Sequence, residues 1–261
     1  MLLETEGLTK TFGGVTAVDE VSFSLPSEQL CSLIGPNGAG KTTFFNLLTG
    51  VLQPNAGTIT FQSDDGPLDI TDASPDATAR LGIHRSYQIT NIFPHTSVLE
   101  NVRIAVQAHR GMDGWRMWRN VRSFDDHFEE AEAILARVGL LEQANRPAGT
   151  LSHGEKRNLE VGIALAGDPE ILLLDEPTSG VSSEDVDTVV DLIEDVSEDH
   201  TVLLIEHNMD VVMDISDRVV VLHRGAVIAD DTPDEIRDSE AVRDAYLGDF
   251  DVEALAEGGG T

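Results

Sequence analysis

Apolar and polar positions predict several strands near the start of the chain. Residues 2–7 and 21–25 look like strands, the second with regular alternation of apolar and polar side chains. Residues 30–34 are more continuously apolar, which is typical of a strand buried on both faces of a parallel sheet. A glycine-rich turn and a helix over 41–49 follow, and a further strand is expected over 58–62.

The middle of the chain has helical periodicity. Two capping boxes, Ser97 with Glu100 and Ser152 with Glu155, predict helices that end near residues 108 and 167. Between them, residues 124–138 place their apolar side chains on one helical face. This stretch therefore predicts a helical lobe.

Strands and helices alternate after the lobe. We expect strands over 171–175 and 201–206, helices over 183–197 and 209–216, a hairpin of 219–222 with 227–229, and a short helix from Thr232. An alternating pattern around an all-helical insert predicts an α/β core that carries a helical lobe.

The domain boundaries follow from this pattern. We expect one domain over 1–248, with the lobe at about 89–165, and a disordered acidic and glycine-rich tail over 249–261. Trp115, Met117 and Trp118 lie in the lobe without clear periodicity, and they suit either its core or a docking surface.

Length and composition suit a cytosolic protein. The 261 residues can bury a sizeable core, and no run approaches the roughly 18 apolar residues needed to span a bilayer. The acidic start lacks the basic region of a signal peptide. Cys31, the single cysteine, excludes an internal disulfide and a thiolate metal cluster, and its apolar neighbours predict core packing. Any attachment to a membrane is therefore expected through partner proteins.

The charge balance is strongly acidic. The chain has 17 basic and 47 acidic residues, for a net charge of −30. Such a charge destabilises a compact fold by self-repulsion in dilute buffer, whereas molar salt shortens the Debye length to roughly 3 Å and screens it. We therefore expect a halophilic cytoplasm; the alternative is a mesophilic protein with an acidic interaction face. Nucleic acid is not an expected partner, because no basic stripe is present.

Residues 35–42 match the phosphate-binding pattern G-x-x-x-x-G-K-[ST] between a buried strand and a helix. Glycines let the backbone curl so that successive N–H groups point at a phosphate, and the helix N-terminus reinforces them. Lys41 would bridge the β- and γ-phosphates, and the Thr42 hydroxyl would bind Mg²⁺. The residues expected to hold the triphosphate are Gly35, Pro36, Asn37, Gly38, Ala39, Gly40, Lys41, Thr42 and Thr43.

The apolar strand at 171–175 ends in Asp175, followed by Glu176. The carboxyl edge of an open α/β sheet is where ligands bind. Asp175 is expected to hold Mg²⁺ through water, and Glu176 to accept a proton from the attacking water. Together with residues 35–42, this pair predicts hydrolysis of a nucleoside triphosphate.

Residues 151–155, Leu-Ser-His-Gly-Glu, resemble the LSGGQ signature of the ABC ATPases, and the motifs follow that family's order over about 2–248. The resemblance implies a P-loop NTPase core of the RecA-like type, with an antiparallel β subdomain and a helical subdomain that carries the signature. It also implies a head-to-tail dimer of identical or paralogous subunits that sandwiches two ATP molecules. Ser152 and Gly154 would then contact the γ-phosphate bound by the partner.

The resemblance assigns three further residues. Gln88 corresponds to the Q-loop glutamine, with a role at Mg²⁺ and in catalysis, and His207 to the switch histidine. Phe12 occupies the place of the aromatic residue that stacks on adenine.

Three positions depart from the family pattern. His153 replaces a glycine, which requires helical or extended backbone there. Glu155 replaces glutamine, but as the third residue of a capping box it can still bind the Ser152 N–H. Ser182 stands where aspartate is common in the family, and we expect it mainly to cap the next helix. The change puts communication between the two ATP sites in doubt, but not ATP binding.

Three stretches are similar to the ATPase subunits of branched-chain amino acid importers: 8–14, 91–102 and 246–248. Two transmembrane permeases and an extracellular solute-binding protein are the implied partners, and the chain would act at the cytoplasmic face of the membrane, in a halophilic archaeon. Residues 151–156 also resemble urea importer subunits, so a urea or short-chain amide importer is the alternative. A soluble ABC ATPase, a lipopolysaccharide exporter subunit and a non-hydrolysing nucleotide binder fit the motifs and composition less well.

Overall fold

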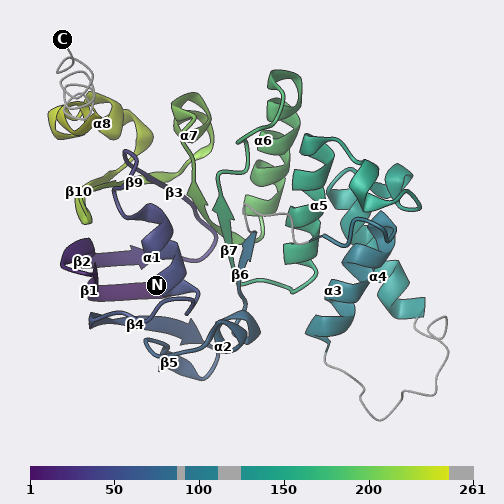
Figure 1. Cartoon of the computed structure of the whole chain (residues 1–261), viewed down its shortest axis with the longest axis horizontal. Helices are drawn as coiled ribbons and strands as arrows, with labels where there is room; N and C mark the ends of the chain where they lie inside the picture. Colours follow the sequence, from purple (N-terminus) through teal and green to yellow (C-terminus); the bar gives the residue numbers. More distant parts are fainter. Residues whose placement is uncertain (87–91, 111–124, 247–261) are drawn as a thin grey trace. The chain divides into compact units, whose positions relative to one another are not determined.

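The computed structural model describes residues 1–86, 92–110 and 125–246. They form two compact units, one from residues 1–78 with the stretch from 201 onward, the other from residues 79–200. Both units combine strands and helices, which confirms the predicted α/β class (Figure 1).

The first unit contains an antiparallel sheet with the order β2-β1-β4-β5. Its strands are β1 (Leu3–Phe12), β2 (Val15–Leu25), β4 (Ala56–Ser63) and β5 (Gly66–Asp69). The predicted strands at the start of the chain are shorter than β1 and β2, because pairing along a hairpin carries both strands through their polar ends to the turn at residues 13 and 14. β5 has no apolar run, and only its pairing with β4 makes it a strand.

A second set of strands in this unit has the order β10-β9-β3-β8. β3 (Leu30–Ile34) lies parallel to both β8 (Thr201–Ile205) and β9 (Arg218–His223), and β10 (Ala226–Asp231) is antiparallel to β9. Every residue of β3 and β8 is buried, as their largely apolar sequences predict.

Helices α1 (Lys41–Leu48), α7 (Met209–Ile215) and α8 (Pro233–Asp238) belong to the same unit, and α2 (Pro75–Arg80) starts in it. α1 buries Phe44 against Phe23, with ring centroids 5.6 Å apart in an edge-to-face arrangement. Removing one such side chain from water stabilises a fold by about 1.5–3 kcal/mol. The start of α1 is therefore held firmly behind the glycine-rich loop.

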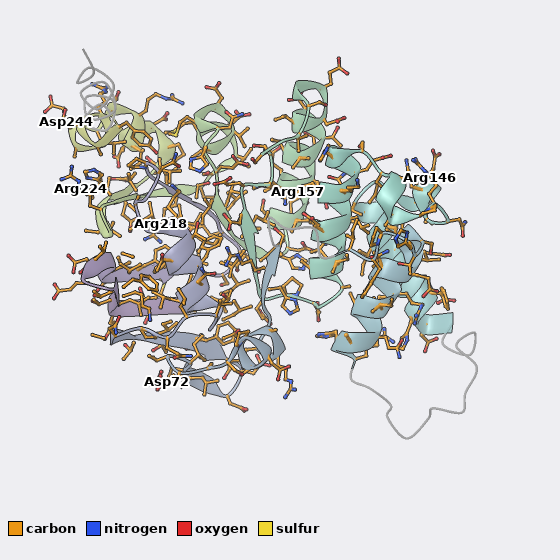
Figure 2. All side chains as sticks on the ribbon, viewed as in Figure 1. Asp72, Arg146, Arg157, Arg218, Arg224 and Asp244 are labelled. Carbon is orange, nitrogen blue, oxygen red and sulfur yellow. The ribbon has the colours of Figure 1, made fainter. Side chains whose placement is uncertain are left out.

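Arg218 on β9 joins this strand to its neighbours in the same unit (Figure 2). Its guanidinium donates to both oxygens of Asp230 at 2.6 Å and to the Ser24 carbonyl at 2.6 Å. It also lies over the Phe23 ring, 5.6 Å from the centroid.

The second unit pairs β6 (Ile83–Ser86) with β7 (Ile171–Asp175) in parallel. Its helices are α3 (Val98–His109), α4 (Asp125–Arg137), α5 (His153–Leu165) and α6 (Ser183–Ser197), with short 3₁₀ turns at Leu141–Gln143 and Ala148–Thr150. α3, α4 and α5 pack against one another, and α5 also packs against α6 (Figure 1). The helices predicted in this region are confirmed.

The packing of α4 follows from its sequence spacing. Ala131, Leu135 and, just after the helix, Val138 are fully buried, as positions four and three residues apart on one face should be. β6, in contrast, was not predicted, because its short run mixes Ile83 with polar residues and becomes a strand only by pairing with β7.

Cys31 is fully buried in β3, which confirms core packing. Burial raises the pKa of its thiol to about 12, so the group is unreactive. In the described ranges, no helix is both long and apolar enough to cross a membrane. Trp115, Met117, Trp118 and the tail over 249–261 lie outside the described residues.

Candidate functional site

The loop between β3 and α1 has a backbone that only glycine permits at two positions. Gly35, Gly38 and Gly40 all have positive φ, at 147°, 79° and 107°. A Cβ on Gly35 would lie 2.0 Å from the Leu222 carbonyl oxygen, and one on Gly40 would lie 2.2 Å from that of Ala17. Both conformation and space therefore require glycine at the two ends of the loop.

Lys41, the first residue of α1, folds back over the loop. Its ammonium donates to the carbonyls of Gly35 at 2.6 Å and Pro36 at 3.1 Å, and the side chain is only 6% exposed. Thr42 is exposed and Thr43 half-buried at the start of the helix. A buried cation is thus fixed within the loop, beside an exposed hydroxyl, which suits an anionic ligand.

Two distant segments hold the loop in place. The Gly225 N–H donates to the Ala39 carbonyl at 2.9 Å, and the Asp19 N–H donates to the Gly225 carbonyl at 2.9 Å. The Tyr246 phenol lies beside the backbone of Gly35; burial raises the pKa of this phenol, although the Gly35 backbone lowers it. Sequence reasoning missed Gly225 and Tyr246, because neither belongs to the loop pattern.

Phe12 and His207 both lie at strand ends of the first unit. Phe12 ends β1, its ring is 45% exposed, and the Lys10 ammonium lies 5.3 Å from the ring centroid. An exposed ring at a strand end can stack on a flat ligand. His207 is exposed two residues after β8, and its backbone N–H donates to the buried Glu206 carboxylate at 3.0 Å.

Asp175 ends β7 and is almost fully buried in the second unit. Its carboxylate accepts a hydrogen bond from the Arg85 guanidinium at 2.5 Å, and the two side chains are 5% and 6% exposed. Arg85 stands on β6, the parallel neighbour of β7. The sequence gives no sign of this pair, which fixes the carboxylate by a charge-assisted hydrogen bond.

Glu176, the next residue, has φ of 50°, an uncommon backbone conformation for a residue other than glycine. Such strain persists only where the surroundings enforce it, and it is common in active sites. Arg157 of α5 provides that constraint by donating to the Glu176 carbonyl at 3.1 Å and to the Pro177 carbonyl at 3.1 Å (Figure 2).

The Arg157 guanidinium is itself fixed by a third bond. It donates to Glu160 at 2.7 Å, and burial raises the pKa of that carboxyl although the neighbouring charge of Arg157 lowers it. Helix α5 therefore holds the backbone of Glu176 by a rigid side chain, a connection that sequence reasoning missed.

The predicted capping box at the start of α5 is confirmed. The Ser152 hydroxyl accepts from the Glu155 N–H at 3.1 Å, and the Glu155 carboxylate accepts from the Ser152 N–H at 2.8 Å. His153 is the first helical residue, so its backbone meets the condition that a side chain at this position requires, and the residue is exposed. A Cβ on Gly154 would lie 3.1 Å from Cβ of Asp185, so a larger residue would crowd α6.

Two capping predictions need correction. Ser182 occupies the position before α6, but its side chain accepts no backbone N–H; the hydroxyl instead donates to the Asp185 carboxylate at 2.7 Å. At α3, Ser97 accepts the Glu100 N–H as predicted, whereas the Glu100 carboxylate pairs with Arg103 at 2.8 Å. In both cases a nearby charged or polar side chain competes successfully with the backbone.

The predicted site residues divide between the two units. The phosphate-binding loop, Phe12 and His207 belong to the first unit, and Ser152, Gly154, Asp175 and Glu176 to the second. Gln88 lies outside the described residues. The expectation that these groups surround one nucleotide stays a prediction.

The donor set suits Mg²⁺, which prefers one or two oxygen ligands from the protein together with phosphate oxygens and water. The first unit offers one such oxygen in the Thr42 hydroxyl, and the second unit offers one in the Asp175 carboxylate; their sharing of one ion stays a prediction. Over the described ranges, no group of three or more His, Cys, Asp or Glu side chains could form a metal cage by itself. Any Mg²⁺ would therefore be held together with the ligand's phosphates.

The arrangement of strand, glycine-rich loop and helix is shared with solved ATP-binding cassettes. The nucleotide-free structure of an ATP-binding cassette from an ABC transporter superposes with a TM-score of 0.80 at 28% identity, covering 94% of this chain and 98% of that one. The family model described as ABC transporter matches residues 18–179. The chain therefore belongs to the ABC transporter family and is an ATPase of the ATP-binding cassette class.

Its relatives are transport ATP-binding proteins. The chain is 41% identical to the high-affinity branched-chain amino acid transport ATP-binding protein BraF of Pseudomonas aeruginosa, over 95% of this chain and 98% of the relative. It is 31% identical, over 97% of both chains, to a probable branched-chain amino acid transport ATP-binding protein, LivG, of Archaeoglobus fulgidus. A second family model, described as branched-chain amino acid ATP-binding cassette transporter, matches residues 226–252.

Proposed function

We propose that this chain is the ATP-hydrolysing subunit of an ABC importer that takes up branched-chain amino acids through partner permeases. The similarity to branched-chain amino acid transport ATP-binding proteins over 95% of the chain carries this proposal. The C-terminal family match supports the same solute class. A urea or short-chain amide importer remains the alternative, since solute never contacts this subunit.

In the proposed mechanism the first unit binds the nucleotide. Phe12 stacks on adenine, and the backbone N–H groups of residues 35–43 bind the phosphates. Lys41 then exchanges its hydrogen bonds to the Gly35 and Pro36 carbonyls for hydrogen bonds to phosphate oxygens. The position of its ammonium within the loop supports this step. Because a buried ammonium is already positioned there, little reorganisation is required.

Hydrolysis is assigned to the second unit together with the first. Thr42, Gln88 and Asp175 would hold Mg²⁺, and the ion would neutralise charge on the phosphates. Glu176 accepts a proton as water attacks the γ-phosphorus, and His207 orients the phosphate; ADP and phosphate leave. The strained Glu176 backbone, held by Arg157, supports its role as a base of fixed position.

The proposed assembly is a head-to-tail dimer of ATPase subunits with two permeases, served by an extracellular solute-binding protein. In the dimer, Ser152 and Gly154 contact the nucleotide of the partner; the exposed N-terminus of α5 supports this, since it presents N–H groups to an anion. We place the complex at the cytoplasmic face of the membrane in a halophilic archaeon, with residues 1–248 as one ATPase domain and residues 249–261 as a disordered tail.

The test is uptake by proteoliposomes that contain the permeases encoded beside this chain, with ATP inside. We expect ATP-dependent accumulation of labelled leucine, isoleucine and valine, and none of urea. Accumulation of urea instead of the amino acids would favour the alternative. ATP turnover without association with any permease would overturn the transport proposal.

A companion variant tests the nucleotide site. Lys41→Ala should lower the ATPase rate by about 10²–10³-fold, the usual cost of removing one catalytic charge-stabilising donor. Arg110→Ala, which removes an exposed arginine paired only with Glu130 among the described residues, is the control and should retain the full rate. Equal rates for both variants would contradict the role of Lys41.

A further inference from the structure

A pocket of about 570 Å³ lies in the first unit, lined by α7, α8 and the segment after α8. α7 and α8 pack side by side (Figure 1). The volume falls within the range of about 300–1,000 Å³ that is typical of small-molecule sites. None of the residues assigned above to nucleotide binding or hydrolysis lines this pocket.

The floor of the pocket is apolar. Met209, Met213, Ile236 and Val242 line it, and Ile236 and Val242 continue into the buried core of the unit. Methionine side chains adapt to ligands of varied shape. The floor therefore suits an aliphatic group of modest size.

Charges of both signs surround this floor. Asp210 and Asp214, one turn apart on α7, line the pocket together with Arg237 on α8 and Arg243 after it, and all four residues are exposed. No ion pair to Asp210 or Asp214 occurs among the described residues. Both arginines are exposed: Arg237 contacts Asp234 at 3.4 Å, and Arg243 contacts Asp238 at 3.7 Å and donates to the Arg237 carbonyl at 3.2 Å.

These charges select the ligand class. Two carboxylates can bind an ammonium group, and two guanidiniums can bind a carboxylate. A molecule that carries both charges and an aliphatic side chain complements the whole pocket, whereas a fatty acid or an alkylamine leaves one pair of charges unmatched. That molecule is a free amino acid with an apolar side chain.

The pocket is connected to the phosphate-binding loop by two contacts. Tyr246 lines the pocket, and its phenol lies beside the backbone of Gly35, the first residue of the loop. Ile34, the residue before it, packs in the same core as Ile236 and Val242. A ligand that shifts the pocket wall therefore also acts on the loop.

We propose that this pocket binds a free amino acid with an aliphatic side chain, and that binding changes the affinity of the phosphate-binding loop for ATP. Binding itself does not depend on the proposed transport function. Feedback regulation by the amino acid does rest on the proposed transport function, because the imported amino acid would then reach this pocket on the side of the membrane where the ATPase lies.

Calorimetry of the full chain in concentrated potassium chloride tests the binding. L-leucine should bind saturably at millimolar concentration, and glycine, isopentylamine and 4-methylpentanoate at least about tenfold more weakly. Asp214→Asn and Arg243→Gln should each weaken leucine binding by about tenfold, equivalent to losing one charge-assisted hydrogen bond. The matched controls Asp65→Asn and Arg110→Gln, at exposed positions outside the pocket, should bind leucine as the parent does.

Three outcomes would overturn the binding claim: no saturable heat from leucine, equal binding of glycine, or unchanged binding in both pocket variants. If ATP still binds in any of these cases, only this inference fails and the proposed function stands. If leucine binds but the proteoliposomes transport a different solute, the proposed function fails and the pocket stands.

The coupling is measured by titrating a fluorescent ATP analogue with and without saturating leucine. We expect the affinity to change by about fivefold or more, the lower range of typical allosteric couplings. Tyr246→Phe keeps the ring that lines the pocket but removes the hydroxyl beside the Gly35 backbone, so it should bind leucine and lose the change in ATP affinity. Equal affinity with and without leucine in the parent protein would refute the coupling.

Discussion

At the scale of single residues, the two carboxylates after β7 are held by arginines in different ways. Arg85 pairs with the Asp175 side chain, whereas Arg157 binds the backbone carbonyl of Glu176 and leaves its carboxylate out of that contact. The first contact fixes a charge, and the second fixes a backbone conformation that would otherwise be unfavourable. Arg85 therefore fixes the charged side chain of Asp175, and Arg157 independently fixes the backbone of Glu176.

The Arg85–Asp175 pair gives a prediction on stability. Arg85→Gln leaves the buried Asp175 carboxylate without its cation and should lower the free energy of unfolding by about 3–5 kcal/mol, as when one partner of a buried pair is removed. The double variant Arg85→Gln, Asp175→Asn should recover part of this loss, because two neutral amides can share a hydrogen bond. Urea unfolding in constant high salt measures both.

Arg110→Gln, at an exposed ion pair, is the control and should change the free energy of unfolding by less than about 1 kcal/mol. An Arg85→Gln protein as stable as this control would show that the pair is not formed in solution.

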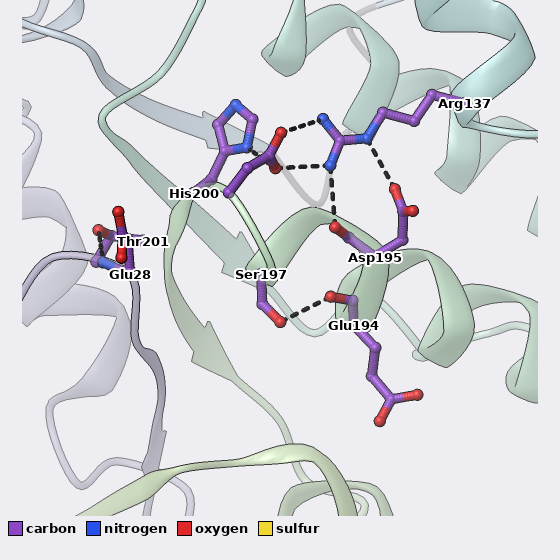
Figure 3. Close-up of polar contacts among 8 residues, drawn as sticks. Glu28, Arg137, Glu194, Asp195, Ser197, His200 and Thr201 are labelled. Carbon is purple, nitrogen blue, oxygen red and sulfur yellow. Dashed lines mark hydrogen bonds and ion pairs between the residues drawn. The ribbon is translucent and has the colours of Figure 1, made fainter.

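At the scale of elements, the end of α4 is fastened to the end of α6 by Arg137 (Figure 3). Its guanidinium donates to the Asp195 carboxylate at 2.7 Å and to both oxygens of Asp199, at 2.7 Å and 3.0 Å. His200 adds a contact of 2.5 Å to Asp199. These bonds, mainly the one from Arg137, lower the pKa of Asp199 from 3.8 to about 2.

The ion-pair cluster of Arg137, Asp195 and Asp199 predicts that the stability of the fold decreases at acidic pH. Because the pKa of Asp199 is lower in the folded chain, its ionised form stabilises the fold above pH 3.8, and this contribution is lost as the pH falls toward 2. Arg137→Gln should reduce stability at pH 5 and flatten the decline between pH 3.8 and 2. Thermal melts of the two proteins across this pH range measure the difference.

Asp65→Asn, which changes an exposed turn carboxylate, should leave the acid profile unchanged. If the melting temperature falls equally steeply with pH in Arg137→Gln and in the parent protein, the ion pairs of Arg137 are not the source of the decline.

The start of α5 shows how one helix can serve several purposes. Its capping box orders the exposed signature residues, and Arg157, in the second turn, reaches the backbone after β7. Both features belong to the unit that also carries Asp175 and Glu176. The signature and the proposed catalytic base are therefore joined through a single rigid helix.

At the scale of the whole molecule, the proposed catalytic cycle requires two subunits. Glu176→Gln keeps the shape of the side chain but cannot accept the proton, so ATP should bind and persist. Light scattering should then show a stable dimer with ATP and Mg²⁺, and monomers without them. Glu198→Gln, an exposed position at the end of α6, should hydrolyse ATP normally and form no lasting dimer. Full turnover by Glu176→Gln would remove this residue as the base.

The net charge of −30 sets the conditions in which the fold is stable. Self-repulsion of the acidic surface is screened at molar salt, so the melting temperature should rise from low to molar potassium chloride. A matched series with a neutral osmolyte separates screening from general solvent effects. A melting temperature that falls with salt would contradict the halophilic hypothesis and favour the alternative, a mesophilic protein with an acidic interaction face.

What the sequence determined by itself was local. The buried strand β3, the glycine loop, the capping box of α5 and the bounds of α6 were all predicted, since each depends on residues a few positions apart. Short-range backbone conformation and burial periodicity decide such features before any long-range contact forms.

Only the tertiary structure decided which distant groups meet. Arg85 lies 90 positions from Asp175, one of 47 acidic residues, and only the pairing of β6 with β7 selects it. Tyr246 reaches Gly35, and α7 meets α8 around a pocket, because packing brings separate segments together. The choice of such partners depends on strand order and helix packing, which no local pattern encodes.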